Sequence, residues 1–265
     1  MMNRTWLLLF FVFLISCSGK NKFPSFVTEK IPAEKVDVKG SLQKAIFDSS
    51  RYSLQNSRIQ KQMDNLMITL GLFQSKNDDF KLDNFEIQWE QFHQVGNDKT
   101  MNSVNTKNWF QINGILLQLT GEAKYAEELE KLIYTGLPGN SLQVNNWITP
   151  YIYTKYVDHI HVNLFIPSEI NYEHSLHGKV RIWQETGYTQ SGDMQIHFSM
   201  EKKRYIELFV RIPDWAEGAS VVVRNVKYLT HPSEYCKIAR EWSEGDKVEI
   251  HFPMEHAPAY IQAGY

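Results

Sequence analysis

Residues 204–223 read RYIELFVRIPDWAEGASVVV, and this stretch decides the fold class. Its first half alternates apolar and polar residues, and the apolar set on one face is Ile206, Leu208, Val210 and Ile212. Alternation with a period of two predicts a β-strand with one buried face. The segment PDWAEGA that follows carries proline and glycine, which favour a turn, and SVVV then begins a second run of β-branched residues.

The same pattern fills the C-terminal half of the chain. A second alternating face is formed by Met194, Ile196, Phe198 and Met200. Seven segments are predicted as strands: HIHVNLFIP (159–167), KVRIWQE (179–185), MQIHFSM (194–200), YIELFVRIP (205–213), ASVVVRN (219–225), EYCKIAR (234–240) and KVEIHFP (247–253). Short alternating strands separated by turns are typical of an antiparallel β-sandwich, which we expect over residues 148–265.

The preceding part of the chain has the spacing of helices. Apolar residues at three-to-four spacing mark one face over 109–119 (Trp109, Ile112, Leu116, Leu119) and another over 122–135 (Tyr125, Leu129, Leu132, Ile133). Gly121 between them suits a helix C-terminus, so two helices joined by a short turn are predicted. Residues 41–73 carry similar spacing, and we assign residues 39–147 to a helical domain.

The N-terminus has the features of an export signal. WLLLFFVFLI is an apolar run of ten residues, shorter than the roughly 20 residues of a membrane-spanning helix. It ends in Leu14-Ile15-Ser16-Cys17, which resembles a bacterial lipobox with Cys17 as the acylated residue. Residues 1–17 are therefore predicted to be a lipoprotein signal peptide, and residues 18–38 a polar tether. The alternative is an ordinary signal peptide with a chance cysteine. Either reading predicts export, and the first predicts a membrane-anchored protein of the cell envelope.

Charge and cysteine content narrow the function classes. The net charge is −2, which gives no reason to expect a nucleic-acid partner. The second of the two cysteines, Cys236, lies in the alternating segment YCKIA and is predicted to be a small half-buried apolar side chain.

Several segments resemble glycoside hydrolase family 127, the β-L-arabinofuranosidase family. The resemblance is carried by QETGYTQSGD (184–193), RIPDWAEGA (211–219) and REWSEGDKVEI (240–250), and it covers roughly residues 148–255. Upstream, WFQINGILLQLTGEAKYAEELEKLIYTGL resembles a late helix pair of that family's (α/α)6 barrel. The resemblance implies an α+β multidomain protein, with an incomplete (α/α) barrel-type helical segment followed by an antiparallel β-sandwich. The interval between tether and sandwich has room for only about half of the helical hairpins of such a barrel.

The resemblance also implies that the family's zinc–cysteine site is lost. In the family, a Glu-Thr-Cys sequence precedes this helix pair, and two adjacent cysteines follow it. Here the first motif corresponds to Asn102, Ser103 and Val104, and residues 136–150 contain no cysteine. Zinc in such a site depends on thiolate ligands, and a sulfur nucleophile needs a thiolate. We therefore expect no zinc cofactor, and interpret Asn102, Ser103 or Asn105 as a helix N-cap.

One catalytic residue of the family could remain. Its general acid/base is a Glu, and WEQFHQ offers Glu90 as the candidate, although residue counting would favour Glu86. A glycosidase also needs a nucleophile or a base, and no partner can be named. Whether the chain is an enzyme stays open at this point, and ordinary surface carboxylates remain the alternative for both residues.

Aromatic residues in the sandwich are candidates for stacking on sugar rings: Trp183, Tyr188, Trp215 and Trp242. The alternative is that they close the edges of the core. His159 and His161 share a face of a predicted strand, but no third ligand for a metal can be named, so both are interpreted as structural.

Three functions are consistent with this sequence. The first is a carbohydrate-binding or structural relative of the β-L-arabinofuranosidases that has lost hydrolysis by the zinc–cysteine route. The second is a glycosidase acting through carboxylates on arabinose-containing plant glycans. The third is a surface module that binds a protein partner. The expected partners are a plant-type oligosaccharide and, through the N-terminal lipid, a membrane; the particular sugar and the oligomeric state are left open.

Overall fold

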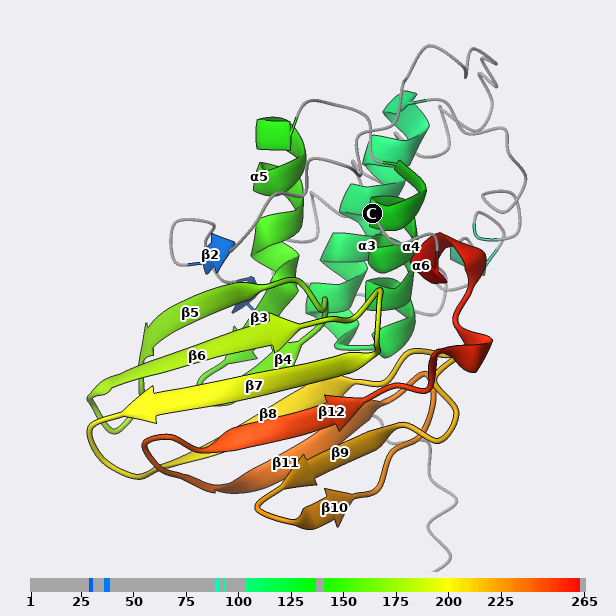
Figure 1. Cartoon of the computed structure of the whole chain (residues 1–265). Helices are drawn as coiled ribbons and strands as arrows, with labels where there is room; N and C mark the ends of the chain where they lie inside the picture. The colour runs from blue at the N-terminus through cyan, green and yellow to red at the C-terminus, as the bar shows by residue number, and fades with distance from the viewer. Residues whose placement is uncertain are drawn as a thin grey trace, which may run out of the picture.

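The fold consists of two packed β-sheets with helices standing along one side (Figure 1). The computed structural model describes residues 29–30, 36–38, 89–90, 93, 103–136 and 141–262. Cys17, Glu86, Asn102 and the predicted helices over 41–73 lie outside these residues.

The five-stranded sheet has the order β1 (Glu29–Lys30), β3 (Tyr153–Tyr156), β4 (His159–Val162), β8 (Arg204–Arg211) and β11 (Tyr235–Trp242). The seven-stranded sheet has the order β10 (Val226–Tyr228), β9 (Ser220–Val223), β12 (Lys247–His251), β7 (Asp193–Met200), β6 (Lys179–Thr186), β5 (Ser168–Glu173) and β2 (Val36–Val38). Neighbouring strands run antiparallel except β4 and β8, which pair in parallel. All seven predicted strands are confirmed.

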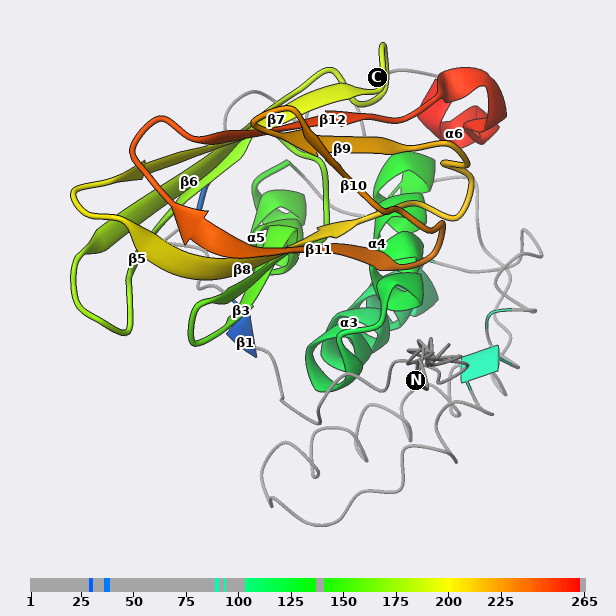
Figure 2. The ribbon, with the colours of Figure 1, turned by 90° about the horizontal axis from the view of Figure 1, so that it is seen from below.

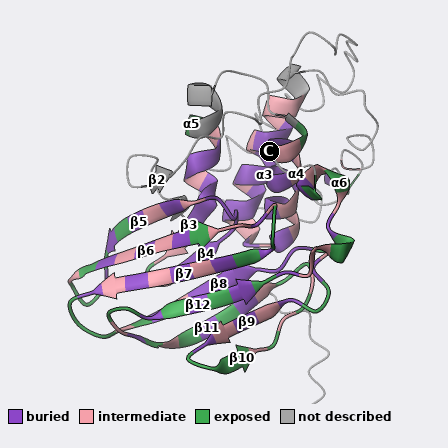
Figure 3. Cartoon of the chain, in the orientation of Figure 1, coloured by how far each residue is buried: buried purple, intermediate pink, exposed green. Residues whose placement is uncertain are grey.

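The core lies between the two sheets, as the alternation predicts. Ile206, Leu208 and Val210 of β8 have no exposed surface. Ile196 and Phe198 belong to the facing sheet, on β7, and are at most 1% exposed. Buried residues alternate with mostly part-exposed ones along β6 and β7 (Figure 3). Burying a large apolar side chain contributes about 1.5–3 kcal/mol, so these two inner faces supply much of the stability of the sandwich.

The helical part contains α3 (Ser103–Thr120), α4 (Ala123–Gly136) and α5 (Ser141–Ile152). Gly121 ends α3 with φ +67°, a conformation that glycine adopts without strain, and its amide donates to the Leu117 carbonyl oxygen at 2.8 Å. Trp109 and Tyr125 are buried in the contact between α3 and α4. The predicted helical hairpin is confirmed. Closure of these helices into a barrel-type array stays a proposal.

Two predicted boundaries are corrected. Helix α5 runs past residue 148, where the sandwich was expected to begin, and the first strand of that region starts at Tyr153. Trp147, Ile148, Tyr151 and Ile152 have helical spacing, but Pro150 within this short segment disguised it. Residues 29–30 and 36–38 were expected to belong to a tether, but they form strands at the edges of the two sheets. Edge strands tolerate prolines nearby, because one side of the strand needs no hydrogen-bond donors. Strands β3, β5 and β10 were also missed.

The helices stand on the side of the sandwich where β2 and β3 lie. Helix α5 packs against both of these strands, and α4 contacts α6 (Ala259–Gln262), which follows the 3₁₀ helix η3 (Met254–His256). Figure 2 shows the two sheets from below with the helices behind them. None of the described helices is long and apolar enough to span a membrane.

Candidate functional site

The segments aligned with the family's zinc and cysteine positions come together at one end of the helical array. Helices α3 and α4 form an antiparallel hairpin, so the start of α3 at Ser103 lies beside the end of α4 at Gly136. This end points away from the sandwich (Figure 1). Asn102 directly precedes α3 and lies outside the described residues, and of Ser103 and Val104 only the backbone is described.

A polar cluster lies at the middle of the hairpin, around the buried carboxylate of Glu128. Trp109 Nε1 donates to Glu128 Oε2 at 3.1 Å, and His93 Nδ1 lies 3.0 Å from Glu128 Oε1. Burial alone would raise the pKa of Glu128, but hydrogen bonds from His93 and Trp109 and the charge of Lys131 lower it. In turn the hydrogen bond to Glu128 raises the pKa of His93. This cluster holds a carboxylate ionised, which suits a structural ion pair better than a proton donor.

Glu90 lies at the surface next to this cluster. Its neighbour Trp89 is 4% exposed, contacts Trp109 and Tyr125, and donates from Nε1 to Asn113 Oδ1 at 2.7 Å. Glu90 itself is exposed. A glycosidase acid works in a site from which water is largely excluded. The structure therefore gives Glu90 an open position beside α3 and α4.

Two of the four aromatic candidates are closed to a sugar ring. Trp242 has no exposed surface, stacks on Phe198 at 3.9 Å and donates from Nε1 to the Ile206 carbonyl oxygen at 3.0 Å. Tyr188 is 2% exposed and its hydroxyl donates to Glu130 Oε2 at 2.9 Å. The proposal that these two rings stack on a sugar is wrong, because both are part of the core.

Trp183 is part-exposed on the outer face of the seven-stranded sheet, but its ring faces are covered. His197 on β7 stacks on one face at 4.9 Å and 10°. The Arg181 guanidinium lies over the ring at 4.7 Å and bonds to Glu169 on β5, which is on the opposite side of Trp183 from β7. A sugar would have to displace one of these partners. Trp215 is half-buried against Tyr188 and Phe252, which leaves it as the aromatic candidate with the fewest covered faces.

The two strand histidines have structural roles. His161 is 5% exposed and stacks on Phe209 at 4.4 Å and 9°, and burial lowers its pKa to about 4. His159 Nε2 lies 3.6 Å from Glu207 Oε2. Across the described parts of the chain, no group of three or more histidine, cysteine, aspartate or glutamate side chains is arranged to hold a metal ion.

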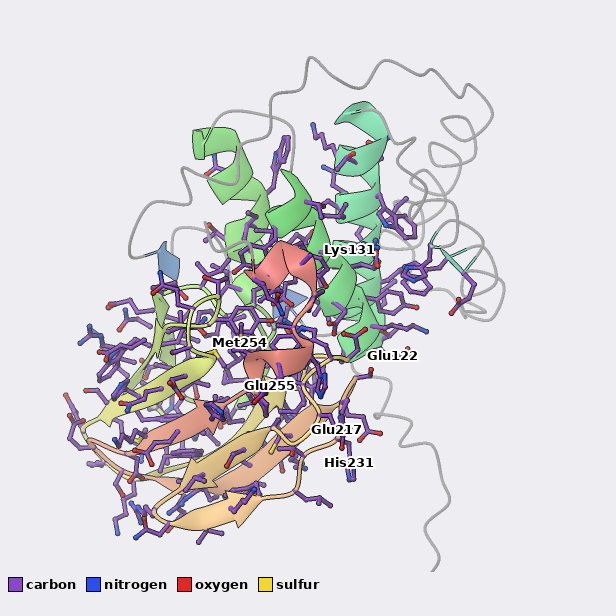
Figure 4. The ribbon with its side chains drawn as sticks, turned by 45° about the vertical axis from the view of Figure 1, so that its right-hand side comes forward. Glu122, Lys131, Glu217, His231, Met254 and Glu255 are labelled. Carbon is purple, nitrogen blue, oxygen red and sulfur yellow. The ribbon has the colours of Figure 1, made fainter. Side chains whose placement is uncertain are left out.

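A buried ion-pair network joins α4 to the sandwich, and sequence reasoning missed it. Arg211 at the end of β8 has no exposed surface. Its Nη2 donates to Glu130 Oε1 at 2.5 Å, its Nη1 to Glu127 Oε2 at 3.1 Å, and its Nε to the Asn163 carbonyl oxygen at 2.7 Å. The side of the molecule that carries this junction is shown in Figure 4, where Glu122 at the start of α4 lies above the loops bearing Glu217 and His231. Residues 127–130 (EELE) on α4 and residues 211–213 (RIP) at the end of β8 both contain charged side chains. Nothing in the sequence predicts that these two segments are in contact.

Carboxyl groups outnumber cations in this junction. Asp214 follows Arg211 closely in the chain, and its amide donates to the Glu127 carboxylate at 3.4 Å. Burial raises the pKa of Glu127 to about 8, with the charge of Glu130 adding to the effect and that of Arg211 opposing it. Burial also raises the pKa of Glu130, against the pull of Arg211 and the Tyr188 hydroxyl. One guanidinium cannot neutralise both the Glu127 and the Glu130 carboxylates, so a proton is retained near neutral pH.

Cys236 is the cysteine that the structure describes, and it is unsuited to nucleophilic chemistry. It is 3% exposed on the inner face of β11, and burial raises the pKa of its thiol to about 11. A thiol in this position stays protonated at neutral pH and out of reach of a substrate. The predicted apolar role is confirmed, and Cys236 is buried fully rather than by half.

The described residues thus define a mainly antiparallel β-sandwich with an attached helical hairpin. Within it, residues 159–254 match the family model for the β-L-arabinofuranosidase GH127 middle domain. The chain is therefore related to the GH127 β-L-arabinofuranosidases, as the sequence motifs indicate. A comparison with curated proteins gave no match.

Solved structures show the same fold. One, described as a glycoside hydrolase, is 22% identical with a TM-score of 0.52, and the match covers 57% of this chain and 32% of that one. A GH127 β-L-arabinofuranosidase from Geobacillus stearothermophilus T6 is 23% identical with a TM-score of 0.50, covering 57% and 31%. A second GH127 β-arabinofuranosidase is 23% identical with a TM-score of 0.50, covering 57% and 32%. The matched region spans about a third of the length of these proteins.

Proposed function

We propose that this chain is a non-hydrolytic relative of the GH127 β-L-arabinofuranosidases that binds neutral, arabinose-containing oligosaccharides at the cell envelope. The family match supports the carbohydrate class, since the solved relatives are named as β-L-arabinofuranosidases. Loss of hydrolysis rests on the residues of this chain itself.

One observation carries the loss of hydrolysis, namely the position of the cysteines. Of the two in the sequence, Cys17 lies in the leading apolar segment and Cys236 is buried in the sandwich with a protonated thiol. Neither lies in the segments at the end of the helical hairpin, where Asn102, Ser103 and Val104 stand in place of the family motif. An amide, a hydroxyl and an isopropyl group are a poor donor set for zinc. The residues present do not fit that metal.

Attachment to a membrane through Cys17 completes the proposal. Ten apolar residues followed by Cys17 and a polar segment fit a lipoprotein signal, and several acyl chains on one cysteine give stable anchoring. Replacing Cys17 with Ser should move the protein from the membrane fraction to the soluble fraction of cells that express it. A chain that remains with the membrane after this change would contradict the lipid anchor.

The hydrolytic alternative can be tested directly. We expect no turnover of a p-nitrophenyl arabinofuranoside, with or without added zinc. Turnover that the change Glu90→Gln abolishes would instead support a glycosidase acting through carboxylates. For the binding function, the full chain in detergent should show a higher melting temperature with arabinan-derived oligosaccharides, because a ligand that binds only the native state stabilises it. An unmoved transition at millimolar sugar would contradict the proposal.

A further inference from the structure

We propose that a hollow on the outer face of the seven-stranded sheet, beside the β6–β7 turn, is the site that binds a neutral oligosaccharide. This inference rests on the proposed function and names its binding site. The aromatic candidates contribute no open ring face here, since Trp242 and Tyr188 are buried, Trp183 is covered on both faces, and Trp215 does not line the hollow. A sugar must therefore be held mainly by polar side chains.

The hollow has a volume of about 580 Å³ and is open to solvent along its length. Strand register places its polar side chains in two rows across the sheet. In one row Ser220 pairs with His251, and His251 with Asp193. In the other, Glu249 lies opposite Val222 and Gln195, and Gln195 lies opposite Glu185. At about 4.8 Å between strands, the first row crosses three strands and is about 10 Å long, and the second crosses four strands and is about 14 Å long, which suits a short chain of sugar rings.

The chemistry of the second row matches adjacent hydroxyl groups. Glu249 and Glu185 each use one carboxylate oxygen within the protein, since Lys247 Nζ lies 2.7 Å from Glu249 Oε1 and Trp183 Nε1 donates to Glu185 Oε1 at 3.3 Å. Their remaining lone pairs can accept hydrogen bonds from sugar hydroxyls, and the Gln195 carboxamide both donates and accepts. Val222 adds an apolar floor next to Glu249. Hydrogen bonds to a charged group are stronger than those between neutral groups, so these carboxylates would supply most of the affinity.

The side chains at the centre of the hollow are available to a ligand. Among the described residues, Gln195 and Ser220 make no side-chain hydrogen bond, and Gln195 is half-buried. Both stand on paired strands, so little backbone freedom is lost when a ligand binds. His251 Nδ1 lies 2.8 Å from Asp193 Oδ1, which fixes the imidazole at the end of the first row.

Charge sets the specificity of this site. Three carboxylates, Glu185, Asp193 and Glu249, face the hollow. The basic groups beside them are Lys247, whose Nζ lies 2.7 Å from Glu249 Oε1, and His251, whose Nδ1 lies 2.8 Å from Asp193 Oδ1, so the carboxylates still outnumber the lysine. An anionic sugar would be repelled, whereas a neutral, hydroxyl-rich one would not. The site should therefore distinguish arabinan-derived oligosaccharides from oligogalacturonides of the same length.

The test is a titration of the ¹⁵N-labelled full chain in detergent, with EDTA present to exclude bound cations. Neutral arabinan-derived oligosaccharides should shift the side-chain amide signal of Gln195, and oligogalacturonides should not. The double change Gln195→Leu and Glu249→Gln should weaken binding by at least about tenfold, because it removes a donor–acceptor pair and a charge-assisted hydrogen bond. The matched control is Glu241→Gln on β11, an exposed carboxylate on the other sheet. It should bind like the unchanged chain.

The outcomes separate this site from the function on which it rests. Binding that survives the double change at unaltered affinity would overturn the site but leave carbohydrate binding standing. Binding of oligogalacturonides with equal affinity would overturn the charge argument and with it the site. No binding of any neutral oligosaccharide to the unchanged chain would overturn both. Far-ultraviolet circular dichroism and a melting curve for each variant show whether a loss of binding comes from unfolding.

Discussion

Replacing Glu127 with Gln tests the charge imbalance around Arg211. The ordinary pKa of this carboxyl group is 4.5, and burial at the junction raises it to about 8 in the folded chain. The folded state therefore keeps a proton that the unfolded state has lost, and stability falls as the pH rises from 4.5 to about 8. Below 4.5 both states are protonated, so this cost is absent. Gln resembles the protonated carboxyl group and cannot ionise, so the variant should not show this loss.

The magnitude follows from the gap between the two pKa values. Each pH unit in that gap corresponds to about 1.4 kcal/mol, which sets a ceiling of about 5 kcal/mol for this group. Because 14% of the Glu127 side chain is exposed, water reduces the cost, and we expect a gain on the order of 2 kcal/mol for the variant at pH 9. At pH 5 the two proteins should differ by less than about 1 kcal/mol, since the amide and the protonated carboxyl group have similar size and hydrogen bonding.

Urea unfolding at pH 5, 7 and 9, followed by tryptophan fluorescence, measures this difference. The matched control is Glu217→Gln, an exposed carboxylate on the loop below α4 (Figure 4). It should follow the unchanged chain at every pH. If Glu127→Gln and the unchanged chain lose stability equally between pH 5 and pH 9, then Glu127 is ionised throughout and the argument from two carboxylates on one guanidinium fails.

Three other changes probe the core and the junction. Replacing Arg211 with Met leaves buried carboxylates without their cation and should lower the free energy of unfolding by about 3–5 kcal/mol at pH 8. The loss should be smaller at pH 5, because Glu130 can take up a proton there. Equal losses in urea unfolding at both pH values would contradict this account. Trp242→Ala should cost about 3–5 kcal/mol through the cavity it leaves between the sheets, and a cost under about 1 kcal/mol would contradict the packing against Phe198. Cys236 should react with a thiol reagent only after the chain is denatured, and rapid labelling of the native chain would contradict its burial.

The sandwich could be predicted because the sequence of each strand alone shows which of its faces is buried. Ile206, Leu208 and Val210 alternate with polar residues, and a period of two identifies an inward face without knowledge of the partner strand. Strands β3, β5 and β10 escaped prediction for the opposite reason. SEINYE and VKY carry few apolar residues, and YTKY follows directly on a helix, so no clear period marks them.

The junction around Arg211 could not be predicted, because it depends on residues far apart in the chain. Arg211 and Glu130 are 81 positions apart, and their meeting is set by how α4 packs against β8. The aromatic candidates failed for a related reason. Sequence shows that Trp183 lies on a strand, but only the sheet order reveals that His197 on β7 covers one face, and that Glu169 on β5 binds Arg181, whose guanidinium lies over the ring. The residue type suggested a platform for a sugar ring, but neighbouring side chains cover both faces of the indole.

The two N-terminal strands determine how the molecule would bear a load. Strand β1 pairs with β3 at the edge of one sheet, and β2 pairs with β5 at the edge of the other, so ten residues of chain reach both layers. A force applied through a lipid on Cys17 would arrive first at β1, whose two residues form a short ladder, and then at β2. Each edge strand would detach before the force reached the core, so a strained anchor would lengthen the chain and leave the sandwich intact.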